Sequence, residues 1–298
     1  MKKYFFAAFM AFSSLANAQT ILEDQFQFNF LAINPAFAGA RESFSMNAML
    51  GNQFNGTLRP QQIYQLFSTD GLIQQERGGL GLQAFNSNSA GFNNSGVKVA
   101  YAYRKQIGDL FSVALGADAG FIYQPTILAG LGLKQMYPYA GLGGLLNADR
   151  FYIGLSKPVA FIKDEGLFNS KKPFYTMLGF SLGEYDGTMF NISALIETNK
   201  IVGNGFHLNG KAWFDRKFSI GISYRSQEVN KVRVNKLIPM AEFQVSDAIR
   251  LGASYDSKPP TFQTSNSTSN FRQNGILQIY FRYEGLGNER GTNRLKYY

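Results

Sequence analysis

The feature that most constrains this chain is an alternation of apolar and polar residues, recurring in segments of about ten residues. In residues 217–225 the even-numbered positions are apolar and the odd-numbered positions are small or polar. The same two-residue period runs through 189–198, 248–256 and 275–284. A strand with one apolar face has this period, and about ten tilted residues cross a bilayer. The pattern therefore predicts an all-β fold, a transmembrane antiparallel β-barrel.

We expect about fourteen such strands, an even number that places both chain ends on the periplasmic side. They are expected near residues 43–51, 60–69, 78–86, 94–105, 110–123, 136–147, 150–161, 173–184, 188–199, 205–215, 217–226, 236–246, 248–256 and 274–284.

The connections between these segments support the same interpretation, because from Asn86 onward short links alternate with longer ones. The short links are 106–109, 147–150, 185–187, 215–216 and 246–247, and the longer ones are 124–135, 162–172, 227–235 and 257–273. The link 200–204 is an exception, short where a long one is due. Short periplasmic turns with longer extracellular loops are typical of outer-membrane barrels. A soluble β-sandwich or jelly roll is the alternative, but it would not sort its loops by side.

Composition fits a membrane barrel better than two soluble domains. Charged residues make up 16% of the chain, against roughly 25% in soluble domains. Glycine (31 residues) and aromatic residues (15%) are abundant, and no later segment is long and apolar enough for a transmembrane helix. Lipid-facing apolar and lumen-facing polar residues would together give the slightly negative mean hydropathy. The absence of cysteine excludes a lipid anchor on cysteine and a disulfide scaffold.

The N-terminus predicts export. Lys2 and Lys3 precede an apolar run from Tyr4 to Leu15, and residues 16–18 read Ala-Asn-Ala, a signal-peptidase pattern. We expect a signal peptide at 1–18 with cleavage near Ala18, and a final location in the cell outer membrane. The rest is expected to divide into a lead-in or plug segment at 19–42, a barrel at 43–284 and a periplasmic tail at 285–298.

The basic balance of the chain bears on its partners. The formal charge is +9, or about +7 once Lys2 and Lys3 are removed. An exported chain without a basic cluster interleaved with aromatics is not expected to bind nucleic acid. Attraction to acidic outer-membrane lipid or to an acidic partner is one interpretation. The other interpretation is that proteins of the source organism are basic in general, so that the charge points to no special partner.

Few residues suggest catalysis. The single histidine, His207, falls on the polar face of 205–214 with Asn209 and Lys211, which indicates a structural imidazole facing the lumen. No set of ligands has the spacing of a zinc site, and we expect no metal or cofactor. Residues 78–81 and 141–144 resemble phosphate loops but lie in expected strands without a following helix, so they more plausibly bend strands or make room in the lumen. We therefore expect a chain that is not an enzyme.

The alternation assigns charged residues of both signs to the lumen. The candidates are Lys98, Arg104, Asp118, Glu197, His207, Lys211, Arg225, Arg250, Arg282 and Glu284. A barrel this wide needs filling by side chains, a plug or a ligand. The residues could line a path for a ligand, or form an ion-pair network that packs and rigidifies the barrel, and we favour the network.

Residues 25–39 carry a resemblance to a known family. They read QFQFNFLAINPAFAG, which resembles the opening of the PorP/SprF family, typically Q-Y-x-x-N-x-x-x-I-N-P-A-Y-A-G after a signal peptide. Shorter similar strings are 79–82, 101–103, 237–239 and 250–256. Phe26 and Phe37 stand where tyrosine is usual, and the chain runs past the last expected strand, where family members often end.

The resemblance implies an outer-membrane component associated with the type IX secretion system of Bacteroidota. Such proteins work with periplasmic and peptidoglycan-linked components, or beside a large surface adhesin that they help to export or anchor, in some members for gliding motility. It implies that this chain binds a secreted protein, such as the C-terminal domain of an adhesin. A transport barrel for small solutes is one alternative, and an outer-membrane lipase or acyltransferase is a second, disfavoured by the inward parity of His207.

The motif also has a physical interpretation. Asn34-Pro35 favours a turn, because the residue before proline avoids the helical region. Gly39 permits a left-handed bend before the first strand. Residues 25–33 mix amides with aromatics, so the segment is expected to be a plug or a lead-in packed under the barrel, with a direct partner-binding arm as the alternative.

Overall fold

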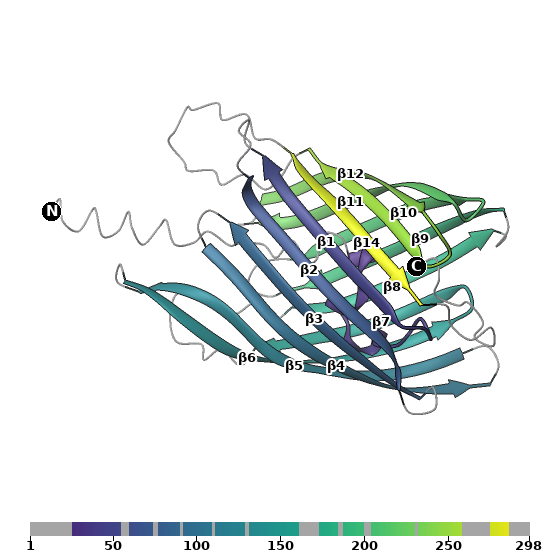
Figure 1. Ribbon diagram of the computed structural model, residues 1–298, viewed down its shortest axis with the longest axis horizontal. Coiled ribbons are helices and arrows are strands. Elements are labelled where there is room, and N and C mark those ends of the chain that lie inside the picture. The colour runs from purple at the N-terminus through teal and green to yellow at the C-terminus, as the bar shows by residue number, and fades with distance from the viewer. Residues whose placement is uncertain are drawn as a thin grey trace.

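The computed structural model forms one closed antiparallel barrel of fourteen strands, β1 to β14, in which each strand pairs with its sequence neighbours and β1 closes on β14 (Figure 1). It describes residues 26–54, 60–73, 77–89, 92–108, 111–128, 131–160, 173–183, 187–199, 204–229, 232–257 and 275–285. The predicted fold class and strand number are confirmed. The expected signal peptide and nearly all of the expected C-terminal tail lie outside the described residues.

All fourteen strands fall where alternation placed them. They are β1 (Ser45–Phe54), β2 (Pro60–Ile73), β3 (Gly78–Ser89), β4 (Phe92–Ile107), β5 (Phe111–Leu128), β6 (Leu131–Ala148), β7 (Phe151–Ala160), β8 (Phe174–Gly183), β9 (Thr188–Thr198), β10 (Gly205–Phe214), β11 (Phe218–Val229), β12 (Val232–Gln244), β13 (Ile249–Asp256) and β14 (Ile276–Glu284).

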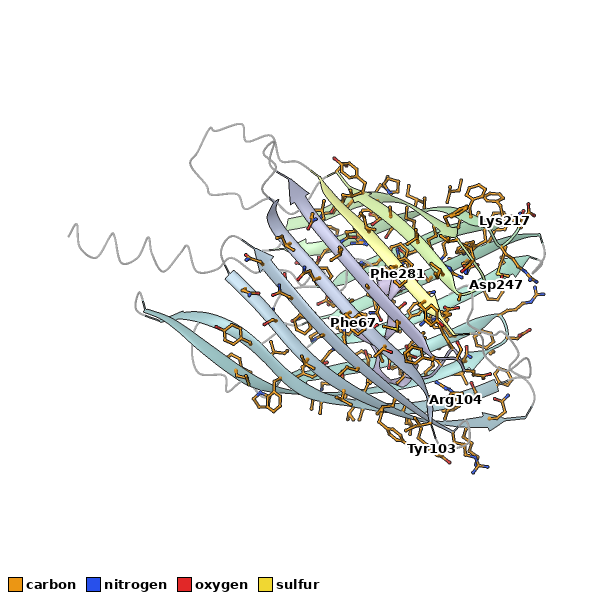
Figure 2. The ribbon with its side chains drawn as sticks, viewed as in Figure 1. Phe67, Tyr103, Arg104, Lys217, Asp247 and Phe281 are labelled. Carbon is orange, nitrogen blue, oxygen red and sulfur yellow. The ribbon has the colours of Figure 1, made fainter. Side chains whose placement is uncertain are left out.

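Alternation along each strand sets the two faces of the wall. In β14 the odd-numbered residues 277–283 are exposed and the even-numbered residues 276–284 are buried. Phe67 and Phe281 belong to a belt of exposed aliphatic and aromatic residues on the outer face (Figure 2). This belt is the surface that lipid covers, so burial of apolar residues occurs against the bilayer as well as inside the barrel.

Two predicted long loops are wrong. The link 124–135 belongs to a hairpin in which β5 and β6 stay paired as far as Leu128 and Leu131. The link 227–235 belongs to a second hairpin that stays paired as far as Val229 and Val232. Beyond the bilayer a strand has no lipid-facing apolar face, so alternation no longer reveals it. The links 162–172 and 258–273 lie outside the described residues.

The short turns at 215–217 and 245–248 lie at the same end of the barrel, where Figure 2 labels Lys217 and Asp247. The turn between β10 and β11 places Asp215 and Arg216 at positive φ, as tight hairpins require. No helix among the described residues reaches the length and hydropathy needed to cross a membrane.

Candidate functional site

Residues 26–41 lie inside the barrel, and we call them the plug. Its described part starts at residue 26 and contains three short 3-10 turns, at 26–28, at η2 (Phe30–Ala32) and at η3 (Pro35–Phe37). Nearly all of its residues are buried although none is in a strand. In Figure 1 it is the purple segment enclosed by the wall. The expected plug or lead-in is therefore an internal plug over the part that the structure describes.

Aromatic side chains anchor the plug to opposite walls. Phe30 stacks on Phe37 with ring centroids 4.9 Å apart, and both contact Tyr152 of β7 edge to face. On the other side, Phe28 stacks on Tyr280 of β14 at 4.6 Å. Buried aromatic pairs contribute about 0.5–1.5 kcal/mol each beyond the area that they bury. These contacts hold the plug from both sides.

Asn34 joins the plug to β6 and β7. Its Oδ1 accepts a hydrogen bond from the backbone N–H of Ala36 at 2.9 Å and caps η3. Its Nδ2 donates to the carbonyl oxygens of Gly144 (3.1 Å) and Leu155 (3.2 Å). A Cβ on Gly143 would overlap the Asn34 side chain. The Asn34 side chain therefore fits only where the wall residue that it contacts has no side chain, as at Gly143.

Further glycines leave room for the plug backbone. A Cβ added to Gly79 of β3 would overlap the carbonyl of Ala38, and one added to Gly116 of β5 would overlap Ala36. Gly39 has a φ of 65°, the left-handed bend that the sequence predicted. Small residues on the inner face of the wall thus form the seat of the plug.

Charged side chains bind the main chain of the plug. Arg104 donates to the carbonyl oxygens of Gly39 (2.8 Å) and Ala38 (3.3 Å). The Asp70 carboxylate accepts from the N–H of Gly39 at 2.8 Å and from the hydroxyl of Ser45 at 2.6 Å. The bend at Gly39 is therefore held by one cation from β4 and one anion from β2.

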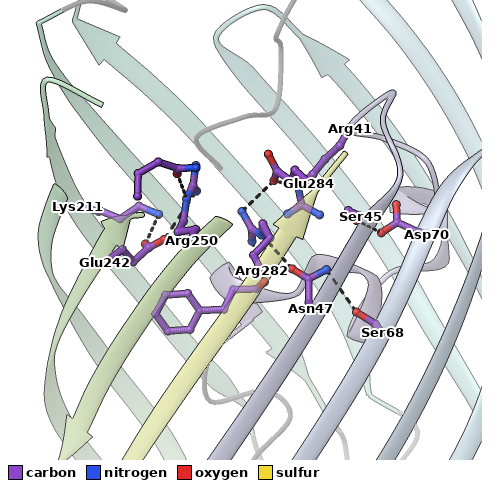
Figure 3. A network of polar contacts seen from close by, with 12 residues as sticks. Arg41, Ser45, Asn47, Ser68, Asp70, Lys211, Glu242, Arg250, Arg282 and Glu284 are labelled. Carbon is purple, nitrogen blue, oxygen red and sulfur yellow. Dashed lines mark hydrogen bonds and ion pairs between the residues drawn. The ribbon is translucent and has the colours of Figure 1, made fainter. Parts of the chain in front are cut away.

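Arg282 of β14 hydrogen-bonds both the plug and β1, and Figure 3 shows its bond to Asn47 of β1. Its Nη2 donates to the Phe28 carbonyl at 2.8 Å and its Nε to the Asn47 side chain at 2.9 Å. Glu284 lies 3.6 Å from Arg282 and 3.3 Å from Arg41. Burial lowers the pKa of the Arg41 guanidinium from its ordinary value, Arg282 acts in the same direction, and Glu284 opposes both.

A second ion-pair cluster lies on the wall of β10, β12 and β13 (Figure 3). Glu242 contacts Lys211 at 2.7 Å and Arg250 at 3.7 Å. Arg250 also stacks on Trp213 at 4.5 Å from the ring centroid. On β4 and β5, Lys98 pairs with Asp118 at 3.5 Å, while its Nζ lies 3.5 Å from the Ala32 carbonyl of the plug.

All ten residues that alternation assigned to the lumen are buried. Six of them, Lys98, Asp118, Lys211, Arg250, Arg282 and Glu284, take part in the ion pairs above. Arg104 binds the plug. Glu197, His207 and Arg225 lie on the inner wall of β9 to β11, with His207 edge-on to Phe26 at 6.4 Å between centroids. A role for these residues in ligand passage stays a proposal.

Sequence reasoning missed Asp70 and Glu242. Asp70 follows the expected end of its strand by one residue and shares the inward parity of Ser68. Glu242 lies between Met240 and Gln244 on a strand face that mixes apolar and polar side chains, so parity gave no clear assignment there. Continuing the alternation by one residue past the expected strand end would have assigned Asp70 to the lumen.

Small cavities border the plug. Two cavities of about 10 Å³ each border it, one beside Arg41 and Asp70 and the other beside Gln27 and Lys211. Each has about the size of one water molecule. Within the described ranges, His, Asp and Glu side chains do not gather in threes that could hold a metal ion.

The fold resembles that of a solved outer membrane protein. Omp33 of Acinetobacter baumannii matches with a TM-score of 0.52 and 7% identity over 83% of this chain and 100% of its own. CdiB of the same organism matches at 0.49 and 5% over 82% and 60%, and KdgM porin at 0.41 and 10% over 80% and 98%. At these identities the likeness to Omp33 supports the barrel fold alone.

A family model described as "Type IX secretion system membrane protein PorP/SprF" matches residues 15–283. The match covers the plug and nearly the whole barrel. No curated protein matches the sequence.

Proposed function

This chain belongs to the PorP/SprF family of type IX secretion system membrane proteins, and we propose that it binds a secreted surface protein and helps to export or anchor it. Its place is the outer membrane, as the family and the closed barrel indicate. Membership implies association with other components of the secretion system. The specific cargo that we propose is an adhesin, whose C-terminal domain contacts the extracellular rim and hairpins, in some settings for gliding.

The plug is the observation that supports binding over solute transport. Arg104 and Asp70 hold its bend, Arg282 holds its start, and Asn34 fixes it to β6 and β7. These bonds come from widely spaced strands. A barrel whose lumen its own chain occupies is better suited to present a surface to partners than to pass small solutes.

We propose that the chain makes and breaks no covalent bond. His207 is buried on the inner face, whereas a barrel enzyme acting on lipid needs its base at the outer face. Neither ring nitrogen of His207 has a hydrogen-bond partner among the described residues. A serine–histidine pair requires such a bond.

The test is affinity purification of the tagged, full-length protein from native membranes, followed by identification of the chains that purify with it. We expect type IX secretion components and one large secreted surface protein. Recovery of neither class would overturn the proposal. A neighbouring gene for a very long repeat-containing adhesin would point to a role dedicated to that one cargo.

A further inference from the structure

The plug joins β1 at the periplasmic end of the barrel. A Cβ on Gly79, the second residue of β3, would overlap the carbonyl of Ala38. Arg41 lies 3.3 Å from Glu284, the last residue of β14, whose N–H donates to Ala248 in the short turn before β13. Short turns are periplasmic in outer-membrane barrels. The end of the plug that leads into β1 is therefore its periplasmic end.

The first described residue of the plug lies higher in the lumen. Phe26 contacts His207 edge to face, with ring centroids 6.4 Å apart. His207 is two positions from Gly205, where β10 begins, and seven from Phe214, where β10 ends beside a short turn. Each residue of a strand tilted by 35–45° climbs about 2.6 Å along the barrel axis. His207 is therefore about 18 Å above the periplasmic end of β10 and only about 5 Å below its extracellular end.

Side chains of the inner wall occupy the periplasmic side of Phe26. Lys211 and Trp213 follow on the inner face of β10, and neither is more than 8% exposed. Glu242 and Arg250 pack against these two side chains. The cavity beside Lys211 measures about 10 Å³, which is room for one water molecule and not for a chain segment. The packing below Phe26 therefore favours an extracellular direction for the residues that precede it.

The length of chain before the plug fits this direction. With cleavage near Ala18, as the sequence predicts, residues 19–25 precede Phe26. Seven extended residues span at most about 25 Å, several times the distance from His207 to the extracellular end of β10. The even strand number predicted both chain ends on the periplasmic side, and β1 does begin there. The chain reaches β1 only after it has crossed the lumen as the plug, so the strand number does not fix the side of the N-terminus.

We propose that residues 19–25 leave the plug on its extracellular side and form a segment that the secreted surface protein binds. Glu23 and Asp24 make this segment acidic, so it fits a basic surface of that partner. The segment is continuous with Phe26, so a partner bound to it is joined directly to the plug. The position of the segment depends on the plug alone, whereas the identity of its partner rests on the proposed function.

The first test labels single cysteines in the full-length protein on intact cells, because the natural chain has none. Thr20→Cys should react with an impermeant maleimide as readily as Asn93→Cys, an exposed position at the extracellular end of β4. Ser246→Cys, in a periplasmic turn, should react only after the outer membrane is permeabilised. The inference is overturned if Thr20→Cys also needs permeabilisation, or does not react before the protein is denatured.

The second test measures the affinity of the full-length barrel for the secreted surface protein that purifies with it. Glu23→Gln combined with Asp24→Asn should weaken binding about two- to thirtyfold, the loss expected for two exposed ion pairs. The matched control, Asp215→Asn with Asp247→Asn, removes two carboxylates from periplasmic turns and should leave binding unchanged. Equal affinities of the two double variants would refute the binding segment, with the proposed function intact. If no secreted protein purifies with the unmodified barrel, the proposed function itself fails, and the labelling test still decides where the segment lies.

Discussion

Replacing Gly143 by alanine should release the plug, whereas replacing its neighbour Gly144 should not. The added Cβ at Gly143 points into the lumen and overlaps the Asn34 side chain, so that side chain must leave its seat. At Gly144 the nearest atom to the added Cβ is on Leu115, at 3.8 Å, which is ordinary contact. The two substitutions change the same strand by the same methyl group, so they form a matched pair.

The expected cost follows from the bonds that Asn34 makes. Moving it removes the cap on η3, worth about 1 kcal/mol. It also leaves the Gly144 and Leu155 carbonyls without its amide, at about 1–3 kcal/mol for buried acceptors. The seated plug should therefore lose about 2–4 kcal/mol, or roughly 30- to 700-fold in its equilibrium with a released state.

Thiol labelling measures this equilibrium, because the natural chain has no cysteine. A cysteine at Ala40, which borders a cavity of about 10 Å³, reacts with an impermeant maleimide only when the plug leaves its seat. Gly143→Ala should accelerate labelling by the factor above, and Gly144→Ala should leave the rate within about twofold of the parent. Equal rates in the two variants would refute the account of the seat.

Two sets of substitutions and one fluorescence measurement test the polar interior. Arg282→Met removes the bonds to the plug and to β1, so it should lower the temperature at which the folded form is lost in heat-modifiability gels. Arg282→Lys should recover only part of that loss, because the ammonium group lacks the spread of the guanidinium that reaches both acceptors. Glu242→Gln leaves Lys211 and Arg250 without their shared carboxylate, so the free energy of unfolding should fall by about 3–5 kcal/mol in urea titrations of the barrel in lipid vesicles. Lys211→Met should lower it by less. Equal losses in the two variants would contradict the paired arrangement. Trp213, the one tryptophan, is 1% exposed, so its emission should be blue-shifted and resist iodide until the barrel unfolds.

The barrel was predictable because lipid enforces a strict two-residue period on each crossing strand. The fourteen segments, and the inward parity of residues such as Arg282, follow from that period alone. The same rule fails where lipid ends. The hairpins at 124–135 and 227–235 are paired strands, and the sequence presented them as loops.

The interior was predictable only in part. Parity places a side chain inside the barrel, but it does not say which partner across the lumen it meets. The bond between Arg282 and the Phe28 carbonyl joins residues 254 positions apart, and it depends on the plug being inside. The turn at Asn34 and the bend at Gly39 were readable, whereas the glycine seat at Gly143 required the wall and the plug together.

The central claim is that this barrel is closed by its own plug and acts by binding. Planar-bilayer recording of the purified full-length protein tests it most directly. The account predicts no steady conductance from the parent protein, and channel openings once Gly143→Ala releases the plug. A steady ohmic conductance of the parent protein would contradict the claim and favour a solute channel.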